Sequence, residues 1–273
     1  MANLGNPKNT IEIIQKYEFM FQKKFGQNFL IDTHVLDKII QSANITEDDM
    51  VLEIGPGIGT MTQYLAQAAG KVIAVEIDKN LIPILEDTLS DYDNVTVINE
   101  DILKVDIAKL AEEKNGGRPI KVVANLPYYI STPIIMKLLE SRLSIDEIIV
   151  MVQKEVAERL TAKTGTRLAG AITYVVEYFS DATEIIRVPK ESFIPSPKVE
   201  SEVIKLEIRK APKISVEDEK FLFDLVQRSF TQRRKTLTNA LVNYGYMKNK
   251  EEVENMWKNL GMEATVRGEN LNL

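Results

Sequence analysis

The chain has 273 residues, of which 44% are hydrophobic and 27% are charged, and this suits a soluble globular protein with one large domain and a small one. It has no cysteine and a single histidine, His34, which excludes disulfides and thiolate chemistry and leaves too few ligands for a histidine metal cage or a catalytic triad. No apolar run approaches the roughly 18 residues of a membrane span, and the N-terminus lacks the apolar stretch of a signal peptide, so we expect a cytoplasmic protein without a metal.

Strand-like and helical stretches alternate between about residue 50 and residue 153. The runs that predict strands are 50–54, 71–77, 94–99, 120–124 and 146–153. The stretches between them that predict helices are 60–69, 80–89, 102–113 and 132–140. This alternation predicts the α/β class, with a doubly wound parallel sheet that carries helices on both faces.

The second half of the chain predicts a change from this domain to a small helical one. Helical stretches at 154–162 and 171–179 and strand-like runs at 182–188 and 200–208 extend the first domain. Lys210-Ala-Pro-Lys213 resembles a linker, and from residue 216 the pattern is helical. Between Leu225 and Lys250 there are six Lys or Arg and no acid, although the net charge of the chain is −6. We therefore expect a domain 1–209, with an N-terminal extension 1–20, and an α-helical domain 210–273 that binds RNA.

Glycines follow the first predicted strand in the run Glu53-Ile-Gly55-Pro-Gly57-Ile-Gly59. They allow a tight turn and let backbone N–H groups approach a ligand closely. The spacing differs from the G-x-G-x-x-G of dinucleotide binding. With an acid two residues before the first glycine, it is the pattern of methyltransferases that use S-adenosylmethionine. A merely structural loop is the alternative.

Acids and an amide end the next three predicted strands. Glu76 lies 21 residues after Gly55 and is placed to accept both ribose hydroxyls of a bound adenosine. Asp78 lies past that strand end, and we interpret it as the cap of the following helix. Asp101 can accept a hydrogen bond from an adenine N6 amine, with a helix cap as its alternative role. These acids and Asn125 fall at the carboxyl ends of successive strands, which is the edge where open α/β sheets bind ligands.

The fourth predicted strand runs into Asn125-Leu126-Pro127-Tyr128. This tetrapeptide combines the amide oxygen of Asn125, the Leu126 carbonyl on a turn that Pro127 makes rigid, and the aromatic face of Tyr128. The two oxygens can accept the N–H groups of an exocyclic amine on a flat base, while the tyrosine stacks on a base splayed out of its RNA. An ordinary turn after a strand is the alternative.

Segments 23–30, 53–59, 125–128, 193–199 and 230–237 together resemble, in the same order, the bacterial 16S rRNA adenine dimethyltransferase family (KsgA type). The resemblance implies a Rossmann-like class I methyltransferase sheet with a small C-terminal α-helical domain, and S-adenosylmethionine as cofactor. It also implies two successive methylations at N6 of each of two adjacent adenosines near the 3′ end of 16S rRNA in the 30S subunit. The residues that it implies bind the cofactor are Asn28, Leu30, Gly55, Glu76, Asp101 and Asn125.

Two further groups of residues have a functional interpretation and an alternative. Phe193 matches the family's Phe-x-Pro-x-Pro motif, and we expect it to cover the second face of the target base; the alternative is an ordinary core aromatic. Lys23, Lys24 and Arg233-Arg234-Lys235 are expected to contact rRNA phosphates. The alternative for these basic residues is a set of solvated side chains.

The leading interpretation is an enzyme: a monomeric rRNA adenine N6-dimethyltransferase that needs neither a metal nor a membrane. A related 23S rRNA adenine methyltransferase of the macrolide-resistance type is one alternative, although segments 193–199 and 230–237 favour the small-subunit family. The other alternative is a ribosome-assembly factor that mainly binds immature 30S subunits. This alternative stays open because a cofactor pocket indicates that the protein can transfer methyl groups, but it does not indicate that methyl transfer is the protein's main role.

Overall fold

The computed structural model describes residues 2–141, 143–231 and 235–273, and at Lys23 the backbone alone. These residues form two compact units. The first unit consists of the residues up to Ala157 together with Ala182–Ile208, and the second of Glu158–Asp181 together with Arg209–Leu273. The first unit ends at Ile208, next to the boundary expected at residue 209. Segment 158–181, expected in the first domain, groups with the second unit by its contacts.

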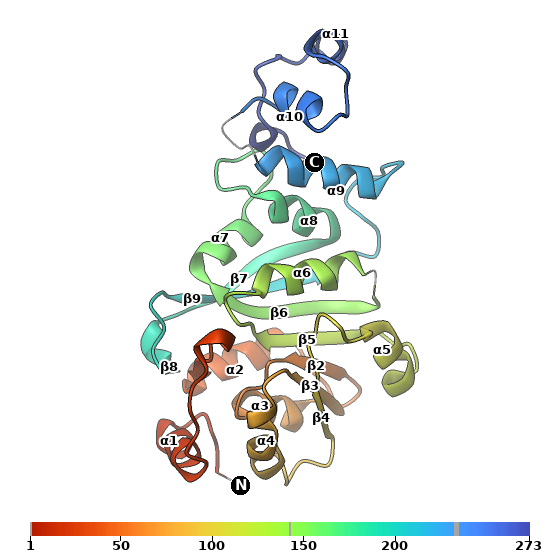
Figure 1. The fold of residues 1–273 in the computed structure, drawn as a ribbon. Coiled ribbons are helices and arrows are strands. Elements are labelled where there is room, and N and C mark those ends of the chain that lie inside the picture. The colour runs from red at the N-terminus through yellow and green to blue at the C-terminus, as the bar shows by residue number, and fades with distance from the viewer. Residues whose placement is uncertain (1, 142, 232–234) are drawn as a thin grey trace. The chain divides into compact units, whose positions relative to one another are not determined.

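A seven-stranded sheet with the order β4-β3-β2-β5-β6-β9-β7 dominates the first unit (Figure 1). The strands from β4 to β6 in this order pair in parallel, and β9 pairs with β6 in antiparallel orientation. The doubly wound α/β sheet is therefore as predicted. The strands are β2 (Met50–Ile54), β3 (Lys71–Glu76), β4 (Val95–Asn99), β5 (Ile120–Asn125), β6 (Ile145–Gln153), β7 (Ser180–Val188) and β9 (Ser201–Ile208), and a separate pair is formed by β1 (Phe29–Leu30) and β8 (Phe193–Ile194).

Helices connect and cover these strands. They are α1 (Pro7–Lys16), α2 (Thr33–Ser42), α3 (Thr60–Ala68), α4 (Ile82–Thr88), α5 (Ile107–Asn115) and α6 (Ser131–Glu140), with short 3-10 turns η1 (Lys23–Phe25), η2 (Lys79–Leu81) and η3 (Lys190–Ser192). The helix predicted from residue 102 begins only at Ile107, because Asp106 caps it there and the residues before it form a turn. Asp78 caps η2 through a bond from the Asn80 N–H, which confirms its predicted capping role.

The strands are apolar because helices bury them. Every residue of β2 is buried, and so are most residues of β5 and β6. Strands buried on both faces form nearly continuous apolar runs, as parallel sheets require. On one side, α2 and α3 pack on the sheet through a cluster that includes Val35, Leu36, Leu65, Val72 and Val123. This packing fixes β2, β3, β4 and β5 so that their carboxyl ends share one edge.

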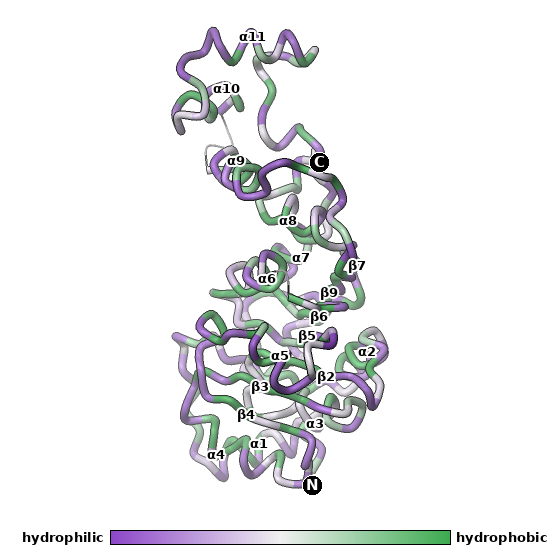
Figure 2. The backbone as a smooth tube through the Cα atoms, turned by 90° about the vertical axis from the view of Figure 1, so that its right-hand side faces the viewer, coloured by the Kyte–Doolittle hydropathy of each residue, from purple (hydrophilic) through white to green (hydrophobic). Residues whose placement is uncertain are grey.

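The second unit is mainly helical. It contains α8 (Ala171–Phe179), α9 (Glu219–Thr231), α10 (Leu237–Asn243), α11 (Lys250–Leu260) and η4 (Gly268–Asn270), together with the second half of α7 (Lys154–Thr161). Hydrophobic residues predominate along α8, whereas α11 carries many hydrophilic ones (Figure 2). The rings of Tyr178 and Phe179 on α8 lie 5.2 and 5.6 Å from the ring of Phe223 on α9. Aromatic packing of this kind explains why segment 158–181 groups with the C-terminal helices.

Candidate active site

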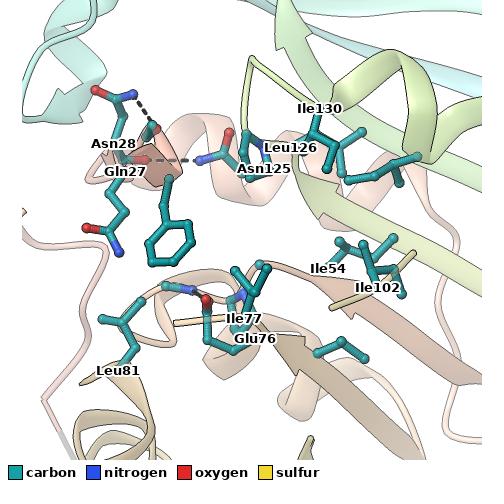
Figure 3. Close-up of a pocket in the computed structure, with 18 of the residues that line it drawn as sticks. Gln27, Asn28, Ile54, Glu76, Ile77, Leu81, Ile102, Asn125, Leu126 and Ile130 are labelled. Carbon is teal, nitrogen blue, oxygen red and sulfur yellow. Dashed lines mark hydrogen bonds between the residues drawn. The ribbon is translucent and has the colours of Figure 1, made fainter. Parts of the chain in front are cut away.

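A cavity with about 990 Å³ of empty space, part of it open to solvent, lies at the carboxyl edge of the sheet. Its walls come from the loop after β2, the ends of β3 and β4, the turn after β5, and the segment 25–30 (Figure 3). Nine of the ten residues that the sequence predicted to bind the cofactor or act in catalysis line this cavity. The tenth, Phe193, does not.

The glycine loop can follow its path only because three of its residues are glycines. Gly55, Gly57 and Gly59 have φ angles of +70°, +62° and +92°, in the left-handed region that glycine adopts without strain. A Cβ added at Gly57 would lie 3.0 Å from two atoms of the Phe29 ring. The loop therefore brings its backbone N–H groups close to the pocket and lets Phe29 pack on it.

Glu76 ends β3 as predicted, and its carboxyl group is held from two sides. The Asp78 N–H donates to Oε1 at 2.8 Å and the Gly57 N–H donates to Oε2 at 3.3 Å. Burial raises the pKa of Glu76 to about 7, while these N–H donors oppose the rise and the charge of Asp78 adds to it. The group is thus a fixed acceptor at the pocket wall that changes its charge near neutral pH.

A second acid, Glu53, lies in β2 directly before the glycine loop. Its side chain is fully buried, and no described residue hydrogen-bonds either carboxyl oxygen within normal geometry. Burial raises the pKa of Glu53 to about 8, with the charge of Glu76 adding to the rise and the Thr62 hydroxyl opposing it. The sequence marked Glu53 as part of the loop pattern but did not indicate that it would be protonated at neutral pH.

Asp101 lies just past the end of β4 and lines the pocket. Its Oδ1 accepts the Leu103 N–H at 2.9 Å, and its backbone carbonyl accepts the Lys104 N–H at 2.8 Å. Asp101 therefore caps a turn, which is the alternative that the sequence left open, and the other carboxyl oxygen is left for a ligand. Ile102, which is buried, and Ile77, which is 42% exposed, add apolar surface to the same pocket.

The tetrapeptide begins at the last residue of β5. Asn125 donates from Nδ2 to the Asn28 carbonyl at 3.2 Å, as the dashed line in Figure 3 shows. This bond uses the donor end of the amide and leaves Oδ1 as an acceptor. Leu126 donates its N–H to the Met151 carbonyl, and the Pro127 carbonyl accepts the Ile130 N–H in a tight turn. Among the described residues, no backbone N–H donates to the Leu126 carbonyl.

Tyr128 lines the pocket with its ring orientation fixed at the hydroxyl end. Its hydroxyl hydrogen-bonds the Ser201 hydroxyl at 2.6 Å, and the residue is partly buried. Burial raises the pKa of Tyr128, with the Ser201 bond opposing the rise. The next residue, Tyr129, also lines the pocket and is 54% exposed. No pattern in the sequence marked Tyr129 as a site residue.

Phe193 lies in the core and not in the pocket. It is 3% exposed, pairs in β8 opposite Leu30 of β1, and belongs to the cluster beneath α2 and α3. This geometry favours the ordinary core aromatic, which is the alternative that the sequence left open. Contact of Phe193 with a target base stays a prediction.

The N-terminal segment is fastened to the pocket by contacts that the sequence did not reveal. The side-chain amides of Gln22 and Gln27 both donate to the Asp78 carboxylate, at 3.1 and 2.7 Å. The Gln22 N–H donates in turn to the Gln27 side chain at 2.8 Å. Asp78 is two residues from Glu76, so this network joins the segment over the pocket to the strand end below it. Only three-dimensional contact reveals it, since these residues are more than 50 positions apart.

The predicted RNA-binding residues are only partly described. Lys24 and Lys235 are exposed, which suits contact with phosphates and equally suits solvated side chains. Arg233, Arg234 and the Lys23 side chain lie outside the described residues. In the second unit, Arg228 pairs with Asp224 at 2.8 Å and lies 5.0 Å from the Tyr244 ring centre. At least one cation of the basic stretch, Arg228, therefore contacts side chains of the second unit itself.

Over residues 2–141, 143–231 and 235–273, no helix is long and apolar enough to cross a membrane. In the same part of the chain, no group of three or more His, Cys, Asp or Glu side chains is placed to hold a metal ion.

Comparison with known sequences identifies relatives over the whole chain. A family model described as ribosomal RNA adenine dimethylase matches residues 18–272. A ribosomal RNA small subunit methyltransferase A from Lachnoclostridium phytofermentans is 60% identical, over 100% of this chain and 95% of the relative. A protein of the same name from Clostridioides difficile is 49% identical, over 100% of this chain and 94% of its own length.

Comparison with solved structures also identifies methyltransferases as similar proteins. A dimethyladenosine transferase from Plasmodium falciparum has a TM-score of 0.70 and 29% identity, over 89% of this chain and 93% of that one. The 23S rRNA methyltransferase ErmE has a TM-score of 0.66 and 26% identity, over 90% of this chain and 95% of that one. The chain belongs to the ribosomal RNA adenine dimethylase family and is an rRNA-methylating enzyme.

Proposed function

We propose that the cavity binds S-adenosylmethionine and that the enzyme dimethylates N6 of two adjacent adenosines near the 3′ end of 16S rRNA in the 30S subunit. The observation that carries this proposal is the convergence of Gly55, Glu76, Asp101 and Asn125 on one cavity from four successive strand ends. Each supplies a group that one part of an adenosine-containing cofactor requires.

The groups present fit that cofactor. The carboxylate of Glu76 can accept hydroxyl donors of a ribose, and the free oxygen of Asp101 can accept the N6 amine of an adenine. Ile77 and Ile102 offer apolar surface to a flat ring. Asn28, Leu30 and the glycine loop close the remaining wall. When bound, S-adenosylmethionine would supply an electrophilic methyl group on its sulfonium.

The tetrapeptide is suited to the methyl acceptor. The N6 amine of adenine is a poor nucleophile because its lone pair is delocalised into the ring. Asn125 Oδ1 and the Leu126 carbonyl can accept its N–H groups and hold the nitrogen so that its lone pair points toward the methyl donor. Tyr128 can stack on the base, with Ser201 fixing the ring. Transfer of the methyl group makes the nitrogen cationic, and it then loses one N–H proton to solvent, so the proposal assigns no general base and relies on alignment of donor and acceptor.

The RNA target is proposed from the relatives and from the charge of the second unit. The relatives that match the full chain at 60% and 49% identity are named for the small ribosomal subunit. We assign rRNA binding to the basic helical region 210–273 and to Lys23 and Lys24, and we propose that the enzyme acts as a cytoplasmic monomer. The likeness to ErmE keeps a 23S rRNA target as the second candidate.

Methyl transfer to defined RNA separates these candidates. The protein is incubated with labelled S-adenosylmethionine and unmethylated 30S subunits, 50S subunits or naked rRNA, and the modified bases are mapped. We expect dimethyladenosine at two adjacent positions of 16S rRNA in 30S subunits. Label confined to 23S rRNA would support the macrolide-resistance type. Tight binding to immature 30S subunits by a catalytically inactive Asn125→Ala variant, with normal subunit maturation, would support a primary role in assembly.

A further inference from the structure

Lys137, on α6, donates to three backbone carbonyls of one short segment. Its Nζ lies 2.9 Å from the Ile102 carbonyl, 2.8 Å from the Leu103 carbonyl and 2.7 Å from the Val105 carbonyl. A lysine ammonium has three N–H donors, so all three are used on this segment. The side chain is partly buried, and such charge-assisted bonds are stronger than neutral ones.

The segment that receives these bonds contains part of the proposed adenine site. Asp101 caps its start through Oδ1, and backbone bonds from Lys104 and Val105 return to the Asp101 carbonyl. This tight turn directs several carbonyls to one side, where they need a donor. Lys137 provides it. The position of Asp101 and Ile102 in the pocket therefore depends on a contact from a different element.

That element also forms the acceptor side of the pocket. Helix α6 follows directly after the tetrapeptide, and Ile130 and Ile134 line the cavity at its start. Lys137 lies one turn beyond Ile134. Figure 3 shows Ile130 and Leu126 on one side of the cavity and Ile102 and Ile54 on the other. Lys137 is thus the polar connection between the helix behind the acceptor turn and the turn that carries Asp101.

We propose that Lys137 is a positioning residue that sets the preference of the pocket for a 6-amino purine, by holding Asp101 at the distance that the N6 amine requires. This inference rests on the proposed function, since it assumes that an adenosine-containing cofactor occupies the pocket. The interaction of Lys137 with carbonyls, and not with the ligand, predicts that its loss weakens recognition of the base and leaves recognition of the ribose by Glu76 in place.

A matched lysine at the opposite edge of the sheet separates positioning from general stabilisation. Lys121, on β5, donates to the Ala43 and Asn44 carbonyls at 2.9 and 2.7 Å and is also partly buried. Lys121 also forms ion pairs with Asp49 at 3.2 Å and with Glu147 at 3.4 Å, so Lys121→Met removes at least as many polar contacts, from a region that does not line the cavity. It should lower thermal stability without changing base preference.

The test measures two affinities by calorimetry for the full chain: S-adenosylhomocysteine, and its inosine analogue, which has an oxo group in place of the amine. Wild type should prefer the adenine compound by about tenfold or more, because a hydrogen bond to a charged acceptor is lost with the analogue. Lys137→Met should reduce this ratio to less than about threefold. Lys137→Arg, which keeps a cation, should retain most of it, and Lys121→Met should retain all of it.

Lys137→Gln, which lacks the ammonium but keeps two N–H donors, is measured beside Lys137→Met. If Lys137→Met fails to fold, Lys137→Gln still provides a variant without the ammonium. An unchanged ratio in every folded variant that lacks the ammonium would overturn the role of Lys137. An equal fall in Lys121→Met would make the effect one of stability and overturn it as well. If wild type binds neither compound, the proposed function itself fails and the inference falls with it.

Discussion

Asn125 and Asn28, which are 97 positions apart in the chain, are joined by a hydrogen bond of 3.2 Å from the Asn125 side-chain Nδ2 to the Asn28 carbonyl. The bond orients the amide so that its donor faces the N-terminal segment and its oxygen is left as an acceptor. It therefore links the wall of the proposed cofactor site to the turn that is proposed to hold the methyl acceptor. A single residue contacts both halves of the proposed reaction centre.

Cofactor affinity should rise with pH through neutrality. The pKa of Glu76 is raised to about 7, and the carboxylate is the better acceptor for ribose hydroxyls, so the protonated form must lose a proton to bind. We expect S-adenosylmethionine affinity to increase between about pH 6 and pH 8 and then to level off. Glu76→Gln should lower affinity by about tenfold or more and remove the pH dependence. Calorimetric titration at three pH values measures both effects.

Glu86→Gln, on an exposed position of α4, is the control and should behave as wild type. A pH profile in Glu76→Gln that matches the wild-type profile would exclude Glu76 as the titrating acceptor.

Stability should fall as pH rises from about 4.5 to about 8. The pKa of Glu53 is raised to about 8 in the folded state, so the native protein binds a proton that the unfolded chain has lost. The stabilising contribution of the protonated acid is complete below pH 4.5 and is lost as the pH passes through 8. Glu53→Gln, which stays neutral, should be more stable than wild type at pH 8.5, by on the order of 5 kcal/mol.

Urea denaturation followed by circular dichroism at pH 5.5, 7 and 8.5 measures this difference. Parallel pH profiles for wild type and Glu53→Gln would mean that Glu53 is ionised in the folded protein.

The Tyr128 ring and its hydroxyl should contribute unequally to methyl transfer. Tyr128→Ala removes stacking on the base, worth about 1–3 kcal/mol, and should slow transfer by roughly tenfold or more. Tyr128→Phe keeps the ring and loses only the bond to Ser201, so we expect a reduction of a few-fold. Ser201→Ala should resemble Tyr128→Phe, and cofactor affinity should stay unchanged in all three variants. Equal activity of Tyr128→Ala and wild type would remove Tyr128 from the acceptor site.

The sequence predicted the parts of the site that depend on local pattern. Gly55, Glu76 and Asn125 could be placed because strand alternation fixes where each strand ends, and parallel strands put those ends on one edge. The strands of the seven-stranded sheet were predicted to within two residues, and β2, β5 and β6 have the clearest pattern because they are mostly apolar and buried.

Contacts between distant segments could not be predicted in this way. Phe193 matched a motif but lies in the core, because pairing with Leu30 turns its ring inward. Gln22 and Gln27 reach Asp78 only in the folded chain. The raised pKa of Glu53 follows from complete burial of its side chain, which depends on the elements packed around it and not on the neighbouring residues in the sequence.

The basic stretch should govern RNA affinity and not cofactor affinity. Replacing Arg233, Arg234 and Lys235 together with alanine should weaken binding to 30S subunits and lower the slope of log affinity against log salt by roughly 2, because fewer counterions are released. Filter binding at four salt concentrations measures this slope. The control, which removes the same charge, is the triple alanine variant of the exposed Lys8, Lys38 and Lys109. A wild-type slope in the first variant would assign the stretch to the solvated surface.

The most direct test of the acceptor site is the methylation state of rRNA produced by Asn125→Ala at saturating S-adenosylmethionine. Asn94→Ala is the control, because this side chain also bonds backbone carbonyls but lies at the opposite edge of the sheet. Mass spectrometry of digested rRNA separates adenosine, monomethyladenosine and dimethyladenosine. If Asn125 Oδ1 holds the target amine, the variant should yield almost no product. The small amount of product that does form should be mainly monomethyladenosine, because the second transfer has only one N–H left to align. Dimethyladenosine at the wild-type yield would contradict the account and place the methyl acceptor elsewhere.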